Sequence, residues 1–269
     1  MRIEQEVIIK APEQRAIDAL AAAVPVLSRQ ALKQAMKKGA VWIKKSKGAK
    51  RLRRATKVLN PPQVLQLFYD DKLLAKTPPQ PELIADHQAY TVWNKPAGLL
   101  AQGSPFGDHC SLLRYAEQFF TPPRESFLVH RLDADAAGLM LIAHTAKAAA
   151  NLSAQFANNT IVKRYQVVVE GKLNQTTTIN SSLNGKKALT TIESIIKCDE
   201  ISSKLLVNIA SGRKHQIRRH LAGIGHPVVG DKKYGAKVLE KPLQLFAVEL
   251  IFNCPVNNTQ QHFSLEPPI

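Results

Sequence analysis

The Lys and Arg residues of this 269-residue chain are concentrated near its beginning. Residues 29–58 carry twelve basic side chains and no acidic one, whereas residues 86–269 carry 20 basic and 14 acidic side chains. A proline-rich stretch, 75–81, follows the basic part, and its prolines lack the N–H donors that helices and central strands require. The sequence therefore predicts a small basic domain over residues 1–75, a linker over 76–88 and a larger domain over 89–269.

The overall charge indicates a polyanionic partner. The formal net charge is +16 and the pI is near 9.9, which favours nucleic acid over a basic surface that only aids solubility. The cysteines, Cys110, Cys198 and Cys254, are far apart and form no C-x-x-C pair, so we expect neither a disulfide framework nor a zinc site.

Nothing in the sequence indicates export or a membrane. The first ten residues mix charged and apolar side chains, unlike a signal peptide, and no run of apolar residues approaches the roughly 18 that a transmembrane helix needs. We expect a cytoplasmic protein that acts as a monomer.

Short apolar stretches predict the fold class. In the small domain the pattern predicts helices over 12–23 and 29–38, with Ser28 as the N-cap and Gly39 as the end of the second, and strands over 40–43 and 64–69. In the larger domain strands outnumber helices and do not alternate strictly with them. They are expected over 90–94, 127–129, 138–143, 165–170, 190–197, 205–210 and 243–252, with helices over 111–120, 145–157 and 215–224. This order favours an α+β fold with a mixed, mostly antiparallel sheet.

Three segments of the larger domain combine charged side chains with turn residues. Residues 129–143 run from an apolar strand through a turn with Arg131, Asp133 and Asp135 into a second apolar strand. Residues 210–221 place four basic side chains and two histidines where a strand meets a helix, whose N-terminus attracts anions. Residues 225–235 are rich in glycine. Each segment also has a simpler explanation: a solvated hairpin, a basic surface helix, and an ordered loop with Asp231 and Tyr234 as packing or capping residues.

Taken together with two shorter segments, these residues resemble the RluA-type family of RNA pseudouridine synthases. The five segments follow the family's order and cover about residues 90–252: NKPAGL from Asn94, HRLD from His130, KRY from Lys163, GRKHQIRRH from Gly212 and GHPVVGDKKYG from Gly225. The chain departs from the family at Ala136 and Ala137, where Thr-Ser is usual, and at Lys214, where Thr is usual. Neither departure removes a catalytic side chain.

The basic domain is similar to the alpha-L RNA-binding module of ribosomal small-subunit protein four. The similar residues are Leu27–Arg29, Lys37–Val41 and the strand near Val64, while Asn60-Pro61-Pro62 replaces the usual Gly-Asp before that strand. The resemblance implies that this domain binds RNA.

The family resemblance implies that the chain isomerises uridine in RNA, without a metal or organic cofactor. It assigns Asp133 as the catalytic carboxylate, Tyr165 as the ring that stacks on the uracil, and Arg218 as the cation paired with Asp133. A carboxylate in a closed pocket is costly to keep charged unless a cation lies nearby. The sequence leaves open whether Asp133 attacks as a nucleophile or removes a sugar proton. Asp135 is the weaker carboxylate candidate, because it would face the other way in an extended turn.

Further basic residues are expected to meet RNA. We predict that Arg131 fills the space left when the target uridine flips out, and that phosphate contacts make the affinity fall steeply with salt. The predicted RNA-binding residues are Arg131, Arg213, Lys214, His215, Lys95, Arg29, Lys37 and Lys38.

Alternative functions remain to be separated. Ribosomal RNA of the large subunit is favoured over transfer RNA, because a separate basic domain suits a large structured substrate. A noncatalytic RNA-binding protein would explain the charge, but it gains nothing from the carboxylate of Asp133. A glycosidase is disfavoured, because Asp133 and Asp135 are too close in sequence to flank a bond and no aromatic cluster for a sugar is evident.

Overall fold

The computed structural model describes residues 1–266. The chain divides into two compact units, and each has its own hydrophobic core. Unit 1 contains Met1–Pro78 together with Gln102–Tyr115, and unit 2 contains Pro79–Ala101 and the described residues from Ala116 onward. The sequence prediction placed residues 102–115 in the larger domain, but they belong to the first compact unit.

Unit 1 is built on a four-stranded antiparallel sheet of order β1-β6-β3-β4. Its strands are Arg2–Ile8 (β1), Val64–Asp70 (β6), Val41–Lys44 (β3) and Ala49–Arg51 (β4). The remaining elements are the paired short strands Gln14–Arg15 (β2) and Val58–Leu59 (β5), and the helices Ala16–Ala23 (α1), Arg29–Lys37 (α2) and Asp71–Leu74 (α3).

Local sequence signals explain where α2 begins and ends. The side chain of Ser28 accepts a hydrogen bond from the N–H of Ala31, and Gly39 follows the helix in the left-handed region with φ +83°. Both signals were predicted. Helix α1 begins at Ala16 rather than at residue 12 as predicted, because Gln14 and Arg15 pair with β5 instead.

Residues 102–115 form hydrogen bonds with β3 and with the end of α2 in unit 1. The indole N–H of Trp42 donates to the carbonyl of Pro105 at 2.9 Å, and the N–H of Asp108 donates to the carbonyl of Lys38 at 3.0 Å. The buried carboxylate of Asp108 pairs with both Arg51 and Arg53. These two arginines belong to the basic stretch of residues 29–58, and their pairing with Asp108 stabilises the fold of unit 1.

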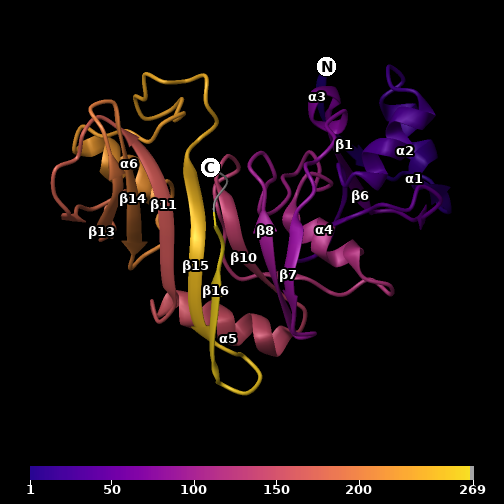
Figure 1. The fold of residues 1–269 in the computed structure, drawn as a ribbon. Coiled ribbons are helices and arrows are strands. Elements are labelled where there is room, and N and C mark those ends of the chain that lie inside the picture. The colour runs from indigo at the N-terminus through magenta and orange to yellow at the C-terminus, as the bar shows by residue number, and fades with distance from the viewer. Residues whose placement is uncertain (267–269) are drawn as a thin grey trace. The chain divides into compact units, whose positions relative to one another are not determined.

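Unit 2 is built on one large sheet (Figure 1). The strand order is β12-β13-β14-β11-β15-β10-β8-β7, with β16 beside β15 and β9 beside β10. The pairing of β10 with β15 is parallel and the other pairings are antiparallel, which confirms the predicted α+β class. The strands are Glu82–Asp86 (β7), Tyr90–Lys95 (β8), Phe127–Leu128 (β9), Ala137–Ala143 (β10), Val162–Glu170 (β11), Thr178–Asn180 (β12), Leu189–Cys198 (β13), Ser202–Ile209 (β14), Leu245–Asn253 (β15) and Gln260–Ser264 (β16).

The helices that follow residue 110 lie close to their predicted places. They are Leu112–Phe119 (α4), Ala146–Ala157 (α5) and Gln216–Gly223 (α6). Helix α5 packs against β10 and β9, and α6 packs against β13. The predicted linker over 76–88 is only partly irregular, because its second half contains β7, which pairs with β8.

The ion pairs of Asp108 predict a stability effect. Asp108→Ala leaves two largely buried arginines without this carboxylate, so we expect unit 1 to lose about 2 kcal/mol of unfolding free energy. Hydrogen exchange by mass spectrometry over residues 29–70 measures it. The matched control is Asp18→Ala, which breaks the exposed ion pair with Arg29 and should change the free energy by less than about 1 kcal/mol. Equal protection in the two variants would contradict the structural role of Asp108.

Candidate active site

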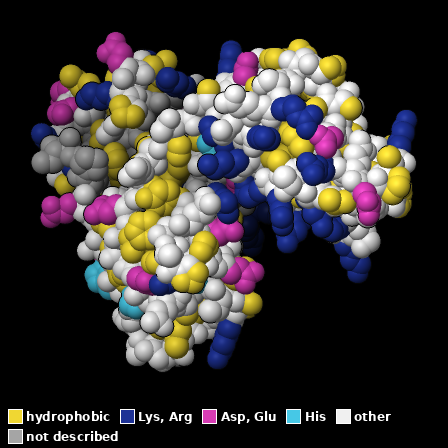
Figure 2. All heavy atoms as spheres, turned by 90° about the vertical axis from the view of Figure 1, so that its right-hand side faces the viewer, with side chains coloured by type: hydrophobic (Ala, Val, Ile, Leu, Met, Phe, Trp, Pro, Cys, Tyr) yellow, Lys and Arg dark blue, Asp and Glu magenta, His cyan; other side chains and the backbone are white. Residues whose placement is uncertain are grey.

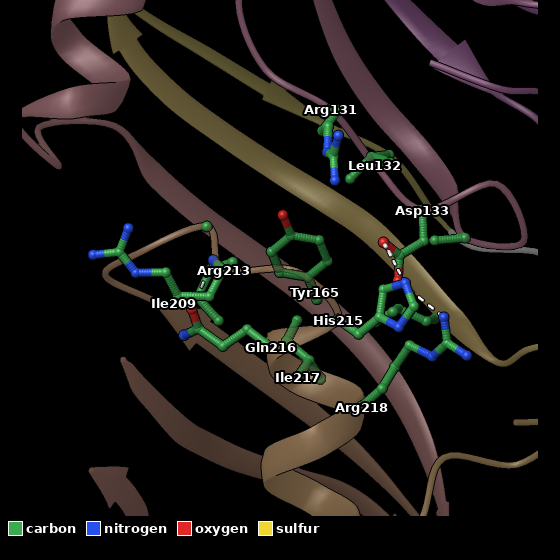
Figure 3. A pocket seen from close by; sticks show the side chains of 13 residues that line it. Arg131, Leu132, Asp133, Tyr165, Ile209, Arg213, His215, Gln216, Ile217 and Arg218 are labelled. Carbon is green, nitrogen blue, oxygen red and sulfur yellow. Dashed lines mark hydrogen bonds and ion pairs between the residues drawn. The ribbon is translucent and has the colours of Figure 1, made fainter. Parts of the chain in front are cut away.

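The loop between β9 and β10 presents Asp133 to an open cavity of unit 2. Leu132 is buried beside it, while Asp133 keeps 23% of its side chain exposed. The empty space in and around the cavity is about 450 Å³, which includes open solvent at its mouth. Its lining comes from this loop, from β11 and β14, from the start of β15, and from the segment that opens α6 (Figure 3).

Lys95 fixes the shape of this loop from below. Its ammonium donates to the carbonyl of Ala134 at 3.1 Å and to that of Leu99 at 2.8 Å, and the N–H of Gly98 also donates to Ala134 at 2.8 Å. Burial lowers the pKa of Lys95 to about 8, although the charges of Asp135 and Asp133 oppose this shift. The predicted RNA contact of Lys95 is therefore wrong, because the side chain is fully buried under the loop.

Arg218 on α6 lies between two carboxylates. Its Nε and Nη2 donate to the two carboxylate oxygens of Asp231 at 2.7 and 2.8 Å, and its Nη1 donates to Oδ2 of Asp133 at 3.1 Å. Asp231 is buried and also accepts from the N–H groups of Lys233 and Tyr234. Asp231 thus caps its own loop, as predicted, and in addition holds the guanidinium in a fork that a lysine could not reproduce.

Arg218 and Asp231 each stabilise the charged form of the other. Hydrogen bonding to Asp231 raises the pKa of Arg218 above its ordinary value, against the effect of burial. Burial pushes the pKa of Asp231 up, but the hydrogen bond and the charge of Arg218 outweigh it, and the pKa lies below its usual range. The pair therefore stays ionised at neutral pH, and its charge remains available to Asp133.

His215 lies near the other carboxylate oxygen of Asp133. Its Nε2 lies 3.8 Å from Oδ1 of Asp133, and its Nδ1 lies 2.9 Å from the hydroxyl of Tyr234. The ring of Tyr234 also faces the guanidinium of Arg218, whose carbon lies 5.2 Å from the ring centre. The sequence predicted a phosphate contact for His215, whereas the structure points its side chain at Asp133 (Figure 3).

Tyr165 forms the wall of the cavity next to Asp133. It lies on β11 and is 9% exposed, and its hydroxyl points toward the side on which Arg131 lies (Figure 3). Burial, helped by the negative charge of Asp133, raises the pKa of the Tyr165 hydroxyl, so that the phenol stays protonated. The structure thus brings together Asp133, Tyr165 and Arg218, the three residues that the resemblance assigned to catalysis.

Gln216 shapes the segment that opens α6. Its side-chain oxygen accepts from the hydroxyl of Ser211 at 2.8 Å and from the N–H of Arg213 at 3.1 Å. The segment therefore curls over the start of the helix. Arg213 and Lys214, for which RNA contacts were predicted, are exposed there. Arg131 is exposed in the loop that carries Asp133 and also lines the cavity.

The predicted RNA-binding residues of unit 1 have different surroundings. Arg29 pairs with Asp18 on the surface, and the ammonium of Lys38 donates to the carbonyl of Leu74. Lys37 is exposed, and Lys33, which the sequence analysis did not single out, is exposed four residues before it on α2. Lys33 and Lys37 are four residues apart and share one face of the helix, so this spacing would have predicted Lys33 as a further RNA contact. Figure 2 shows dark-blue Lys and Arg side chains gathered over part of one face of the molecule.

No helix within residues 1–266 is long and apolar enough to cross a membrane. Over the same residues, His, Cys, Asp and Glu side chains form no group of three or more that could hold a metal ion.

Comparison with known proteins gives consistent results. The family described as RNA pseudouridylate synthase matches residues 89–223, which include Asp133, Tyr165 and Arg218 but end before Asp231 and Tyr234. The chain is similar to an uncharacterised RNA pseudouridine synthase of Aquifex aeolicus, at 30% identity over 97% of this chain and 92% of that protein. It is also similar to ribosomal large subunit pseudouridine synthase D of Zymomonas mobilis, at 30% identity over 93% of this chain and 89% of that protein.

A third relative and a solved structure match less of the chain. The dual-specificity RNA pseudouridine synthase RluA of Pasteurella multocida is 32% identical over 72% of this chain and 98% of its own length. The structure of human RNA Pseudouridylate Synthase Domain Containing 1 superposes with a TM-score of 0.58 over 72% of this chain and 87% of that one, at 21% identity. The latter likeness establishes a shared fold.

The fork between Arg218 and Asp231 predicts the effect of a conservative change. Arg218→Lys replaces two donors aimed at Asp231 by one ammonium, so we expect the unfolding free energy to fall by about 3 kcal/mol. Urea denaturation followed by circular dichroism measures it. The control is Arg219→Lys, since the neighbouring arginine contacts Asn184 at the surface and its loss should change the free energy by less than about 0.5 kcal/mol. If both variants were as stable as the parent, the buried fork would not stabilise the fold.

Proposed function

Because the chain belongs to the RNA pseudouridine synthase family, we propose that it converts uridines of large-subunit ribosomal RNA to pseudouridine, with Asp133 as its catalytic carboxylate. One observation carries the assignment of the site. Arg218, fixed by the buried Asp231, extends a third donor to Asp133, whose carboxylate lines the cavity beside Tyr165. Phosphate binding alone would not need a carboxylate in that position.

The reaction is an isomerisation without net oxidation or reduction. The bond between C1′ of the ribose and N1 of the uracil breaks, the base turns over, and a bond forms between C1′ and C5. The hydrogen on C5 leaves as a proton and N1 gains one, so atoms and electrons balance. The protein must therefore supply one basic or nucleophilic group, a place for the detached base and a path for one proton.

The two oxygens of Asp133 have different surroundings, which suits this chemistry. Oδ2 accepts the hydrogen bond from Arg218, while Oδ1 faces the cavity at 3.8 Å from His215. We assign Oδ1 as the reacting oxygen, whether it attacks C1′ or removes a sugar proton. The ion pair holds the carboxylate in one orientation, so the oxygen is positioned before the substrate arrives.

We assign Tyr165 to contact with the target uracil, and Arg131 to the RNA helix that the uracil leaves. The ring of Tyr165 offers an apolar face on which a uracil stacks, a contact worth about 1–3 kcal/mol per base. Its protonated hydroxyl is a hydrogen-bond donor at the site where the base turns. The exposed guanidinium of Arg131 fits the space left in the RNA by the flipped nucleotide.

The coverage of the relatives supports ribosomal RNA as the substrate. The Zymomonas mobilis enzyme, which is named for the large ribosomal subunit, aligns with 93% of the chain, and so its match must include most of the basic residues 1–78. The Pasteurella multocida enzyme is named as dual-specificity and aligns with 72% of the chain, about the share of residues 79–269. We therefore propose ribosomal RNA first and transfer RNA second, and expect the protein to act in the cytoplasm.

We propose that unit 1 adds RNA affinity as an alpha-L-type module. Helix α2 buries Leu32 and Met36 against its core and exposes Lys33 and Lys37 on the opposite side. Such a row of cations one helical turn apart suits successive phosphates of an RNA strand. Arg51 and Arg53 contribute to this surface less than their number would indicate, because Asp108 neutralises part of their charge.

The proposed activity is tested by a change at Asp133. Pseudouridine is mapped chemically in total RNA from cells that carry the intact gene, a deletion, or Asp133→Asn. We expect at least one site in large-subunit ribosomal RNA to disappear in both altered strains, because the amide is neither a base nor a nucleophile at that position. In purified protein the same variant should keep less than about 0.1% of the parent rate.

The matched control is Asp135→Asn. Asp135 is exposed two residues further along the same loop, and we expect its variant to restore the modification in the deletion strain. If pseudouridine disappeared from transfer RNA alone, transfer RNA and not ribosomal RNA would be the substrate. An unchanged pseudouridine map in the deletion strain, together with inactive purified protein on unmodified RNA, would favour a noncatalytic RNA-binding protein and overturn the proposal.

A further inference from the structure

His215 has an unusual backbone conformation for a residue with a side chain. It precedes α6 as the N-cap with φ 54° and ψ 33°, in the left-handed region that costs a residue with a Cβ about 1 kcal/mol or more. It makes no capping hydrogen bond from its side chain. A glycine would adopt this conformation without strain, so the imidazole must serve a purpose other than ending the loop.

The imidazole lies between a hydroxyl and the carboxylate of Asp133. Its Nδ1 is 2.9 Å from the Tyr234 hydroxyl, and its Nε2 is 3.8 Å from Oδ1 of Asp133. If Nδ1 carried the proton, the lone pair of Nε2 would face the carboxylate and repel it. Electrostatics therefore favours the tautomer in which Tyr234 donates to Nδ1 and the N–H of Nε2 points at Asp133.

We propose that His215, held by Tyr234, is a positioning residue that directs Oδ1 of Asp133 toward the substrate. The inference rests on the proposed function and deepens it, because it concerns the same carboxylate. The neutral imidazole offers Oδ1 a weak N–H contact at the edge of the cavity, while Arg218 holds Oδ2. Oδ1 is thus oriented and yet still free to react.

The charge of the imidazole decides whether this arrangement works. An imidazolium would form an ion pair with Oδ1, so that both oxygens of Asp133 would be engaged and neither could act. Burial lowers the pKa of His215 below its usual 6.5; the carboxylate of Asp133 opposes this, and nearby cations reinforce it. The groups that face the ring are Asp133, Arg218, Lys233, Lys214 and the hydroxyl of Tyr234.

The direction of the pH effect follows from these charges. At neutral pH the imidazole is uncharged and Oδ1 is available. As the pH falls through the lowered pKa of His215, the imidazole gains a proton and occupies Oδ1, so the catalytic rate falls. The competing hypothesis is the phosphate contact that the sequence predicted, in which His215 would affect RNA affinity and leave the catalytic rate unchanged.

Substitutions at His215 and Tyr234 separate these roles. His215→Asn tolerates the left-handed backbone and can still contact Tyr234, but its side chain is too short to reach Asp133. His215→Gln places an amide N–H about as far from the backbone as Nε2 of the histidine. This N–H does not titrate. Tyr234→Phe removes the hydroxyl that fixes the tautomer and keeps the ring beside Arg218.

The experiment measures kcat and KM against pH on unmodified large-subunit ribosomal RNA, by release of tritium from C5 of the uridines. We expect His215→Asn and Tyr234→Phe to lower kcat about tenfold with KM little changed, because the carboxylate is less well oriented. The parent enzyme should lose kcat as the pH falls through the lowered pKa of His215, whereas His215→Gln should be more active than His215→Asn and should not show this loss at acid pH.

Two results would overturn the inference. One is a kcat in His215→Asn equal to that of the parent at every pH. The other is a raised KM with a shallower salt dependence at unchanged kcat, which would assign His215 to a phosphate. His262→Asn, at an exposed histidine paired with Glu249, is the matched control and should behave like the parent. An inactive parent enzyme would instead contradict the proposed function, so the two failures are distinguishable.

Discussion

The site depends on one arginine that is shared by two carboxylates. Arg218 is almost fully buried and contacts Asp231 through Nε and Nη2 and Asp133 through Nη1. A single carboxylate already balances the charge of a buried guanidinium, so charge alone does not require a contact with a second carboxylate. Because its fork geometry leaves a third donor free after the bidentate contact, Arg218 can be anchored by one carboxylate and still orient the other. Asp231 thus anchors Arg218, and Arg218 orients Asp133, the carboxylate that we propose as catalytic.

The surrounding elements keep the partners of this arginine in place. The buried ammonium of Lys95 donates to the carbonyl of Ala134 and to that of Leu99, and the first of these bonds fixes the backbone on the C-terminal side of Asp133. Gln216 ties the segment before α6 to its own helix, and this sets the direction from which His215 enters. The loops are therefore ordered by buried polar groups whose hydrogen bonds are satisfied within the protein. The carboxylate of Asp133 is therefore held in one orientation by groups of the protein itself.

The sequence predicted much of this arrangement, and its errors have identifiable causes. Strands and helices with clear apolar patterns or caps, such as α2 after Ser28 and α5 after Thr145, were found within a few residues. Strand β7 was not predicted, because the neighbouring prolines favoured a linker there. The attachment of residues 102–115 to unit 1 was not predicted either, because it depends on contacts between distant parts of the chain. Lys95 was assigned to RNA from its charge alone, because local sequence does not reveal burial. The position of His215 beside Asp133 was also not evident from the sequence, because its left-handed backbone conformation is set by the fold.

The most direct test of this account is the rate of the chemical step in Asp231→Asn. The amide presents a donor where Nε or Nη2 of Arg218 requires an acceptor, so the guanidinium loses its anchor although no atom that touches the substrate has changed. In a single-turnover experiment with saturating unmodified ribosomal RNA, we expect a rate about a hundredfold below that of the parent, at similar RNA affinity. A folded Asp231→Asn protein with the parent rate would contradict the claim that Asp231 positions Arg218 for Asp133.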